Sequence, residues 1–353
     1  MKYRLLLIWW GFLVHSVFTK REMVEKILAD RVKTPKNSEG NYFAPSNIAL
    51  AKYWGKRNNE LNLPVTSSLS ISLGQYGADT TLSLGDGQND AVFINGEAAS
   101  VESSFVQNLV RFLDLFRVTP DMRFTVKTNI NLPIGAGLAS SACGFAALTG
   151  ALDQLFGWEL PKSSLSLLAR LGSGSASRSF WQGFVEWQAG TREDGVDSVG
   201  VPIVNRWDDL RIGILLLDPK PKPLSSRAGM QATVLTSPFY SAWPAKQQAD
   251  LFAIQTAIEE QDFIKLGERS ESNALAMHAL MMTADPAIIY STPQTLAAQQ
   301  FIWQQRSNGL SLYFTQDAGP NLKLLFLAPD IERVSSLFPD LLLISPFQKK
   351  EEK

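Results

Sequence analysis

The chain has 353 residues, of which 45% are hydrophobic, and a formal net charge of -1. Such a chain can bury a large core, as one large domain or two lobes, and its near-neutral charge gives no polybasic surface for nucleic acid or an anionic membrane. Cys143 is the only cysteine, and His15 and His278 are the only histidines. An internal disulfide, a cysteine-built zinc site and a multi-histidine metal centre are therefore excluded, and any chemistry must depend on Asp, Lys, Arg and Ser.

The first 22 residues differ from the rest of the chain. Lys2 and Arg4 precede an apolar run from Leu5 to Val14, which is too short to span a bilayer as a helix but has the length of the hydrophobic part of a secretory signal. No convincing cleavage site follows, and Met23 opens a segment that could start a soluble protein. We predict that residues 1–22 are an extension outside the fold and that the protein is cytoplasmic, with no membrane partner. A real signal or a peripheral anchor is the alternative.

The segment from Ser46 to Arg57 is predicted to be an apolar strand that ends in polar and aromatic side chains. Alternation places Lys52 and Trp54 on one side and Tyr53 on the other, and Gly55 permits a turn that brings Lys56 back towards them. Two cations and a phenol could hold a phosphorylated substrate. An edge strand with solvated lysines is the alternative.

A glycine-rich loop lies between a predicted strand and a predicted helix. Apolar residues alternate over residues 63–73 and again over 123–133, as in half-buried strands, and a helical spacing over 145–155 predicts a helix that ends at Gly157. Small residues and the free N–H groups of a helix start can approach a phosphate closely, whereas a turn before a serine-capped helix is the alternative. The residues of this candidate cradle are Gly135, Gly137, Leu138, Ala139, Ser140 and Ser141.

A second candidate anion-binding segment follows a predicted helix over residues 163–171. Its serine hydroxyls and flexible amides could surround phosphate oxygens, and the Arg178 guanidinium presents the planar fork that fits a carboxylate, although a flexible linker is the alternative. The segment contains Ser173, Gly174, Ser175, Ala176, Ser177 and Arg178. Strands are predicted over 184–187 and 210–218.

The stretch from Pro219 to Ser226 has the composition of a linker and predicts a boundary between two lobes. We therefore predict an N-terminal lobe over residues 23–218 and a C-terminal lobe over 219–353. Ser226 and Arg227 directly after the linker could bind a further anion or belong to an ordinary loop.

The C-terminal part predicts helices over about 247–266 and 293–307, and another that carries His278, which we expect to be a surface or packing residue. Two apolar strands flank the loop from Asp317 to Asn321. Asp317 could cap a turn, or it could orient and deprotonate an alcohol beside a lysine and an arginine. Strand pairs mixed with helices predict an α+β architecture in two layers.

Five motifs occur in an order that is highly specific: "NIALAKYWGKR", "SSLSISL", "GLASSACGFAAL", "GSGSASRSFWQGFVEW" and "DAGPN". Together they resemble the diphosphomevalonate decarboxylases, a family within the small-molecule kinase superfamily that includes homoserine, galacto- and mevalonate kinases. The resemblance runs from about Ala44 to Asn321. It implies a two-lobed GHMP-kinase-like fold, with a ribosomal protein S5 domain 2-like N-terminal lobe, an α/β-sandwich C-terminal lobe and the active site between them.

The resemblance also implies the reaction. ATP and Mg²⁺ would phosphorylate the C3 hydroxyl of (R)-5-diphosphomevalonate, after which phosphate and CO₂ leave and isopentenyl diphosphate forms. A decarboxylase of the monophosphorylated substrate, or a kinase that stops after phosphorylation, are the alternatives. We expect no nucleic-acid partner and a homodimer.

The site residues follow from the same resemblance. Asp317 would orient or deprotonate the hydroxyl, Lys52 would lie beside it, and Arg178 would hold the substrate carboxylate. Asn47, Trp54, Gly55, Gly174, Ala176 and Ser177 would support the substrate, and the diphosphate would be surrounded by Tyr53, Lys56, Ser173, Ser175, Ser226 and Arg227. The cradle from Gly135 to Ser141 would bind ATP, with Ser141 as a ligand of its Mg²⁺.

Overall fold

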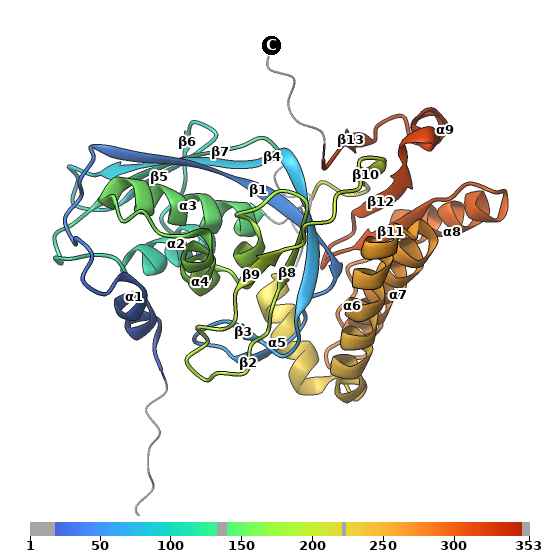
Figure 1. Ribbon diagram of the computed structural model, residues 1–353, viewed down its shortest axis with the longest axis horizontal. Coiled ribbons are helices and arrows are strands. Elements are labelled where there is room, and N and C mark those ends of the chain that lie inside the picture. Colours follow the sequence, from blue (N-terminus) through green and yellow to red (C-terminus); the bar gives the residue numbers. More distant parts are fainter. Residues whose placement is uncertain (1–17, 133–139, 221–223, 348–353) are drawn as a thin grey trace, which may run out of the picture.

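The computed structural model describes residues 18–132, 140–220 and 224–347 of the chain (Figure 1). The N-terminal half contains these elements: α1 (Lys20–Leu28), β1 (Glu39–Ala51), β2 (Lys56–Asn58), β3 (Leu63–Pro64), β4 (Ser68–Leu84), β5 (Ala91–Ile94), β6 (Glu97–Ala98), α2 (Ser104–Leu113), β7 (Phe124–Ile130), α3 (Ser140–Phe156), α4 (Lys162–Gly172), η1 (Gly174–Arg178), β8 (Phe184–Trp187) and β9 (Gly200–Pro202). The C-terminal half contains β10 (Leu210–Leu215), α5 (Ser226–Thr236), η2 (Tyr240–Ala242), α6 (Trp243–Glu260), α7 (Phe263–Met282), α8 (Pro293–Ser307), β11 (Tyr313–Gln316), β12 (Leu322–Leu327), η3 (Ala328–Asp330), α9 (Ile331–Leu337) and β13 (Leu342–Ile344).

The N-terminal half is a largely antiparallel sheet covered on one face by helices. Within the described residues its strand order is β6-β5-β7-β4-β8-β9, and β1 also pairs with β4. Strand β4 is long enough to pair with β7 through one end and with β8 through the other. Helices α2, α3 and α4 lie on the same side of this sheet in Figure 1, and their apolar faces enclose a core that includes Phe124, Leu148 and Leu168. The strand predicted over 123–133 and the helix predicted over 163–171 are confirmed, apart from shifts at their ends. The strand predicted over 63–73 is divided, because β3 ends at Pro64 and β4 begins at Ser68 in another sheet.

Helix α1 corrects the predicted extension over residues 1–22. The helix begins at Lys20 and is capped by Thr19, whose side chain accepts from the Glu22 N–H while the Glu22 carboxylate accepts from the Thr19 N–H. Met23 and Leu28 are buried in the core of the N-terminal half. A boundary between residues 22 and 23 would therefore cut through the first turn of a packed helix. The apolar run that precedes this helix in the sequence is the reason why its first residues were predicted to lie outside the fold.

The C-terminal half contains a second sheet, in the order β11-β12-β10-β13 within the described residues. Helices α6, α7 and α8 lie beside it in Figure 1. The lobe division at residues 218 and 219 stays a prediction, but β10, which precedes it, pairs with β12 and β13 of this sheet and not with the N-terminal one. One apolar cluster joins the halves, because Ile48 and Ile71 of the first sheet share it with Ile212, Leu325 and Ile254 of the second half.

The helix predicted over about 247–266 is wrong as a single element. It is divided between α6 and α7 at Gln261, which adopts the left-handed conformation with φ 55°, and Asp262, whose side chain caps α7 by accepting from the Lys265 N–H. The apolar spacing continues across the break, so the sequence pattern alone does not locate it.

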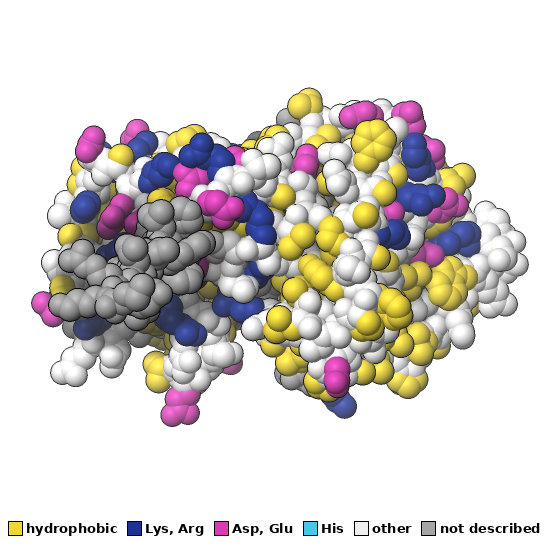
Figure 2. All heavy atoms as spheres, turned by 90° about the horizontal axis from the view of Figure 1, so that it is seen from below, with side chains coloured by type: hydrophobic (Ala, Val, Ile, Leu, Met, Phe, Trp, Pro, Cys, Tyr) yellow, Lys and Arg dark blue, Asp and Glu magenta, His cyan; other side chains and the backbone are white. Residues whose placement is uncertain are grey.

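The surface of the two halves differs in composition. Figure 2 shows hydrophobic side chains gathered over the half that carries α6 to α8, where Phe239, Phe252 and Leu235 are exposed. In the part of the chain that the structure describes, no helix is both long and apolar enough to cross a membrane.

Candidate active site

Lys52 directly follows strand β1 and lies at the junction of the two halves. The strand ends at Ala51, so Lys52 to Gly55 form an irregular segment where the sequence predicts a continued strand. The Lys52 side chain is 2% exposed, and its backbone N–H donates to Asn273 Oδ1 of α7 at 2.8 Å. Its Nζ donates to the Ala49 carbonyl at 2.8 Å. Lys52 is therefore held by contacts from both halves, through its backbone N–H and its ammonium.

Asp317 lies between two buried lysines. Its Oδ1 is 2.8 Å from Lys52 Nζ, and its Oδ2 is 3.2 Å from Lys323 Nζ of β12. Both lysines are almost fully buried, whereas a quarter of the Asp317 side chain is exposed. His278 Nε2 lies 3.1 Å from the Asp317 carbonyl oxygen, which fixes the backbone of the loop. The carboxylate is thus held by two cations with part of its surface open to a ligand.

These contacts set the protonation states. Burial would raise the pKa of Asp317, but Lys323 and Lys52 outweigh it and lower that pKa well below its ordinary value, so the group is a carboxylate at neutral pH. Burial lowers the pKa of Lys52 to about 8 against the opposing effect of Asp317. Burial also lowers the pKa of His278 to about 4, so the ring is neutral and packs as predicted.

Arg178 ends the short helix η1 and points to the same junction. The side chain is 2% exposed, donates to Ser68 Oγ, and donates to Asn47 Oδ1 at 3.3 Å through one terminal nitrogen. Asn47 in turn donates to Ser179 Oγ at 2.8 Å. Burial lowers the pKa of Arg178 to about 10, with Asp317 opposing the shift. Arg178 stays cationic at neutral pH, and its hydrogen-bond partners in the described residues, Asn47 and Ser68, are neutral, which leaves its charge available to an anion.

Tyr53 and Gly55 shape the wall beside Arg178. The Tyr53 ring packs edge-on against Trp187, with centroids 4.7 Å apart, and its buried hydroxyl has no partner among the described residues. Such a hydroxyl is free to hydrogen-bond to a ligand group or to water. Gly55 has φ +121°, and a Cβ there would lie 1.8 Å from the Tyr240 hydroxyl, so only glycine fits. The predicted turn at Gly55 is confirmed. Trp54 lies in the C-terminal apolar core.

Lys56 and Arg227 line a cavity of about 360 Å³, together with Lys20, Asn62 and Met230. Lys56 Nζ donates to Asn62 Oδ1 at 2.6 Å, and Arg227 donates to the Gly172 carbonyl at 3.3 Å. The sequence placed Lys20 outside the fold, and the structure brings it to this cavity. Residues from three separate parts of the chain therefore present cations to one space.

The remaining predicted substrate residues have different surroundings. Ser173 Oγ and Ser175 Oγ lie 3.2 Å apart at the edge of η1. Ala176 is fully buried, and the buried Ser177 hydroxyl donates to the Gly174 carbonyl at 2.9 Å, so these two residues hold the turn in shape. Ser226 opens α5 and is half-buried, next to Arg227.

The predicted ATP cradle is described only in part. Gly135, Gly137, Leu138 and Ala139 lie outside the described residues. Ser140 begins α3, Ser141 is exposed in its first turn, and that turn carries no acidic side chain. The start of a 17-residue helix without a carboxylate beside its free N–H groups fits a phosphate.

Besides Lys20, two residues of the site were missed from the sequence. Lys323 is a lysine in the otherwise apolar stretch "LKLLFLA", and a charge in a buried strand is a signal that could have identified it. Asn273 gave no comparable signal. It is buried, and its Nδ2 donates to Gln247 Oε1 and to Asp250 Oδ2, so it ties the Lys52 backbone to α6.

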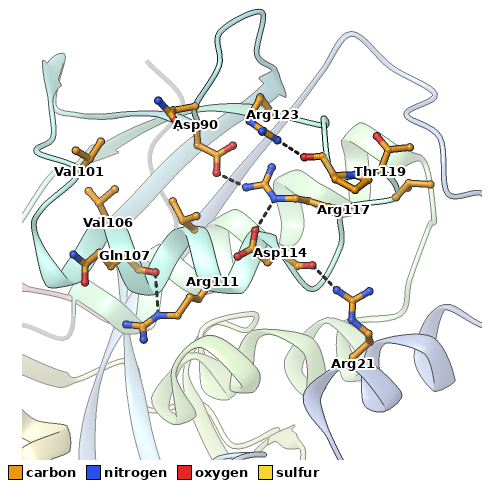
Figure 3. A pocket seen from close by; sticks show the side chains of 14 residues that line it. Arg21, Asp90, Val101, Val106, Gln107, Arg111, Asp114, Arg117, Thr119 and Arg123 are labelled. Carbon is orange, nitrogen blue, oxygen red and sulfur yellow. Dashed lines mark hydrogen bonds and ion pairs between the residues drawn. The ribbon is translucent and has the colours of Figure 1, made fainter.

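A separate cavity of about 960 Å³ lies against the outer face of α2 and shares no lining residue with this site (Figure 3). Its arginines already have protein acceptors. Arg117 is paired with Asp90 and Asp114, Arg21 donates to the Asp114 carbonyl, and Arg123 donates to main-chain carbonyl groups. Because these arginines have acceptors within the protein, we infer no ligand for this cavity.

Comparisons with known proteins agree over most of the chain. Residues 44–200 match a family model described as the diphosphomevalonate decarboxylase-like N-terminal domain, and residues 212–352 match the mevalonate 5-diphosphate decarboxylase C-terminal domain. The diphosphomevalonate decarboxylase of Candida albicans is 36% identical over 312 residues, which cover 83% of this chain and 86% of that protein.

Solved structures give the same relationship. The mevalonate diphosphate decarboxylase of Enterococcus faecalis is 36% identical, covers 88% of this chain and 97% of its own, and superimposes with a TM-score of 0.80. A structure described as MDDEF in complex with MVAPP, AMPPCP and magnesium is 37% identical over the same shares, with a TM-score of 0.81. The two-lobed GHMP-kinase-like fold expected from the motifs is confirmed.

Proposed function

Because the chain belongs to the diphosphomevalonate decarboxylase family, we propose that it converts (R)-5-diphosphomevalonate to isopentenyl diphosphate in the mevalonate pathway, with consumption of ATP and release of ADP, phosphate and CO₂. It is a carboxy-lyase that uses ATP and Mg²⁺. The observation that carries this proposal is the junction where Asp317 is paired with Lys52 and Lys323 and a buried, charged Arg178 lies beside them.

Asp317 orients the C3 hydroxyl. The exposed part of its carboxylate accepts the hydroxyl proton, which aligns the oxygen with the terminal phosphorus of ATP. Its depressed pKa makes it a weak base at rest, so its main effect is orientation, and the proton transfers as the new oxygen–phosphorus bond forms. Lys52 is close enough to stabilise negative charge on the transferring phosphoryl group.

Arg178 holds the substrate carboxylate. In the second step the bond between that carboxyl carbon and C2 breaks, its electron pair forms the C2–C3 double bond, and the phosphate on C3 leaves with the C–O bond electrons. A planar guanidinium fixed by Asn47 and Ser68 keeps the carboxylate in line for this cleavage.

The diphosphate binds where cations and hydroxyls converge. The unpartnered Tyr53 hydroxyl supports this assignment, as do Lys56 and Arg227 in the cavity between the halves. Ser173, Ser175 and Ser226 lie at its border. ATP supplies the phosphoryl group when it is bound. The free N–H groups at the start of α3 would hold its phosphates, and Ser141 would hold the Mg²⁺ that accompanies them.

The experiment that tests this function measures ADP and CO₂ together. Protein is incubated with ATP, Mg²⁺ and either (R)-5-diphosphomevalonate or (R)-5-phosphomevalonate. We expect equal amounts of ADP and CO₂, with the diphosphate as the preferred substrate. ADP without CO₂ would show a kinase, and preference for the monophosphate would show the other decarboxylase. A cytoplasmic location and a homodimer stay predictions, and sedimentation of the purified protein would test the dimer.

A further inference from the structure

Helix α1 places a third cation in the cavity that already contains Lys56 and Arg227. The cavity is lined by Lys20 of α1, Lys56 of β2 and Arg227 of α5. Lys20 lies outside both ranges matched by the family models, which begin at residue 44. Lys20 therefore reaches the cavity from a helix outside the two matched domains.

The fold fixes Lys20 at this position. Its backbone N–H donates to Glu60 Oε1 at 3.4 Å, in the turn between β2 and β3. Further along α1, Met23 is fully buried and Lys26 is paired with Asp194 at 2.8 Å. The capping box at Thr19 stabilises the turn that carries Lys20. A lysine on a packed and capped helix costs less entropy to order around a ligand than one on a free terminus.

The pKa values of the two lysines are affected by their surroundings. Burial, Arg227 and Lys20 together lower the pKa of Lys56 to about 8, and burial is the largest cause. Burial lowers the pKa of Lys20 as well, with Glu60 opposing and Arg227 and Arg111 adding to the shift. Cations gathered in a partly buried space repel one another, and an anion of high charge relieves that repulsion.

The chain path gives the position of the Lys20 cavity relative to the reacting carbon. Lys52 is paired with Asp317, and the segment from Lys52 to Gly55 leads directly to Lys56. Lys56 lines the cavity together with Lys20 and Arg227, and Arg227 donates to the Gly172 carbonyl, just before the short helix that ends in Arg178. The cavity with Lys20 therefore adjoins the junction that contains Asp317 and Arg178. A substrate with its hydroxyl and carboxylate at Asp317 and Arg178 would extend its diphosphate towards Lys20.

We propose that Lys20 binds the terminal phosphate of the substrate diphosphate and is a residue that selects the diphosphorylated over the monophosphorylated substrate. This role rests on the proposed function. Lys56, Arg227 and Tyr53 reach the phosphate next to the carbon chain, which both substrates carry. Lys20 reaches the phosphate that only the diphosphate carries.

The test is Lys20→Gln, measured with both substrates. The KM for diphosphomevalonate rises about tenfold, because one charge-assisted contact to the phosphate is lost, while its kcat changes less than about twofold. The KM for phosphomevalonate stays the same. Lys20→Arg restores most of the discrimination, since a guanidinium also binds phosphate. Lys33→Gln is the matched control. It removes the same charge from an exposed lysine after α1, and it leaves both KM values unchanged.

Two results would overturn the assignment: an equal change in KM for both substrates, which indicates general steering or a loosened helix, or no change for either. Calorimetry of the ATP-free protein with inorganic pyrophosphate and with inorganic phosphate supplies a readout independent of turnover. We expect Lys20→Gln to weaken pyrophosphate binding selectively. If the unaltered chain releases no CO₂ from either substrate, the proposed function fails, and the calorimetric comparison still decides whether Lys20 binds a second phosphate.

Discussion

The two charged regions of the site differ in how their charges are balanced. At the junction, the Asp317 carboxylate is matched by Lys52 and Lys323, both almost fully buried. In the cavity, Lys20, Lys56 and Arg227 face the same space, and burial together with the Arg227 charge lowers the pKa of both lysines. The first region is preorganised without ligand, and the second is completed by an anion. Changes in the first should therefore affect turnover, and changes in the second should affect substrate binding.

The largest effect is expected at Asp317. Asp317→Asn keeps the shape but removes the charge that orients the hydroxyl, so kcat should fall roughly 10²- to 10⁴-fold, with KM for the substrate nearly unchanged. ADP and CO₂ should disappear together. A variant that forms ADP at the normal rate but releases no CO₂ would show that Asp317 acts in the step after phosphoryl transfer.

The same substitution tests stability. If Asp317 were only a turn cap, as the sequence pattern allows, Asn could replace it and lower the free energy of unfolding by about 1 kcal/mol or less. The ion pairs instead predict a loss of about 1 to 3 kcal/mol in the free energy of unfolding, because two buried lysines lose their counter-ion while Asp317 itself is partly solvated. Asp340→Asn, at an exposed position, is the control for denaturant unfolding.

Arg178→Lys should give the next largest effect. The lysine keeps the charge but cannot donate two parallel hydrogen bonds to a carboxylate, so kcat/KM should fall roughly 10- to 100-fold while the KM for ATP changes little. Steady-state kinetics with each substrate varied in turn measures both. Arg333→Lys, on the surface helix α9, is the control and should leave kcat/KM and the KM for ATP unchanged. An unaltered kcat/KM in Arg178→Lys would show that Arg178 does not bind the carboxylate.

The pH profile compares the regions directly, since each contains a lysine whose pKa is about 8. Ordinary lysines stay charged to about pH 10.5, so the loss of charge here begins earlier as pH rises. If both charges are needed, kcat/KM should fall roughly 15-fold between pH 7 and 8.5, with two protons lost. Lys56→Arg should reduce this to one proton. Asp317 should cause no fall in kcat/KM between pH 7 and pH 5, because its lowered pKa keeps it ionised over this range. A single-proton limb in the unaltered chain would contradict the comparison.

The smallest effect is expected from the N-terminus. A chain that begins at Met23 loses the Thr19 capping box and Lys20, so its free energy of unfolding should fall by about 1 kcal/mol and its KM for diphosphomevalonate should rise about tenfold. A chain that begins at Phe18 keeps both and serves as the control. Equal KM values for these two chains would show that residues 18–22 have no part in binding.

Much of the fold and the catalytic chemistry was predictable from sequence. The alternation in 123–133 and the helical spacing in 145–155 are local patterns, and local patterns identify strands and helices directly. The division at Gln261 and the start of α1 were not predicted correctly. The division depends on the left-handed backbone of Gln261, which interrupts a continuous apolar pattern. The start of α1 depends on the burial of Met23, which follows an apolar run that resembles a signal segment.

The sequence by itself determined which chemical groups are present: a chain without the cysteines and histidines of a metal centre, with an aspartate in a loop, an arginine after a glycine-serine segment and a lysine at a strand end. Only the tertiary structure decided which of them meet. Lys52 and Asp317 are 265 residues apart in the chain, and Lys323 and Lys20 enter the site from a buried strand and an N-terminal helix. Sequence patterns report neighbours within a few residues, whereas a buried ion pair forms only after the sheets and helices of both halves have packed and excluded water around it.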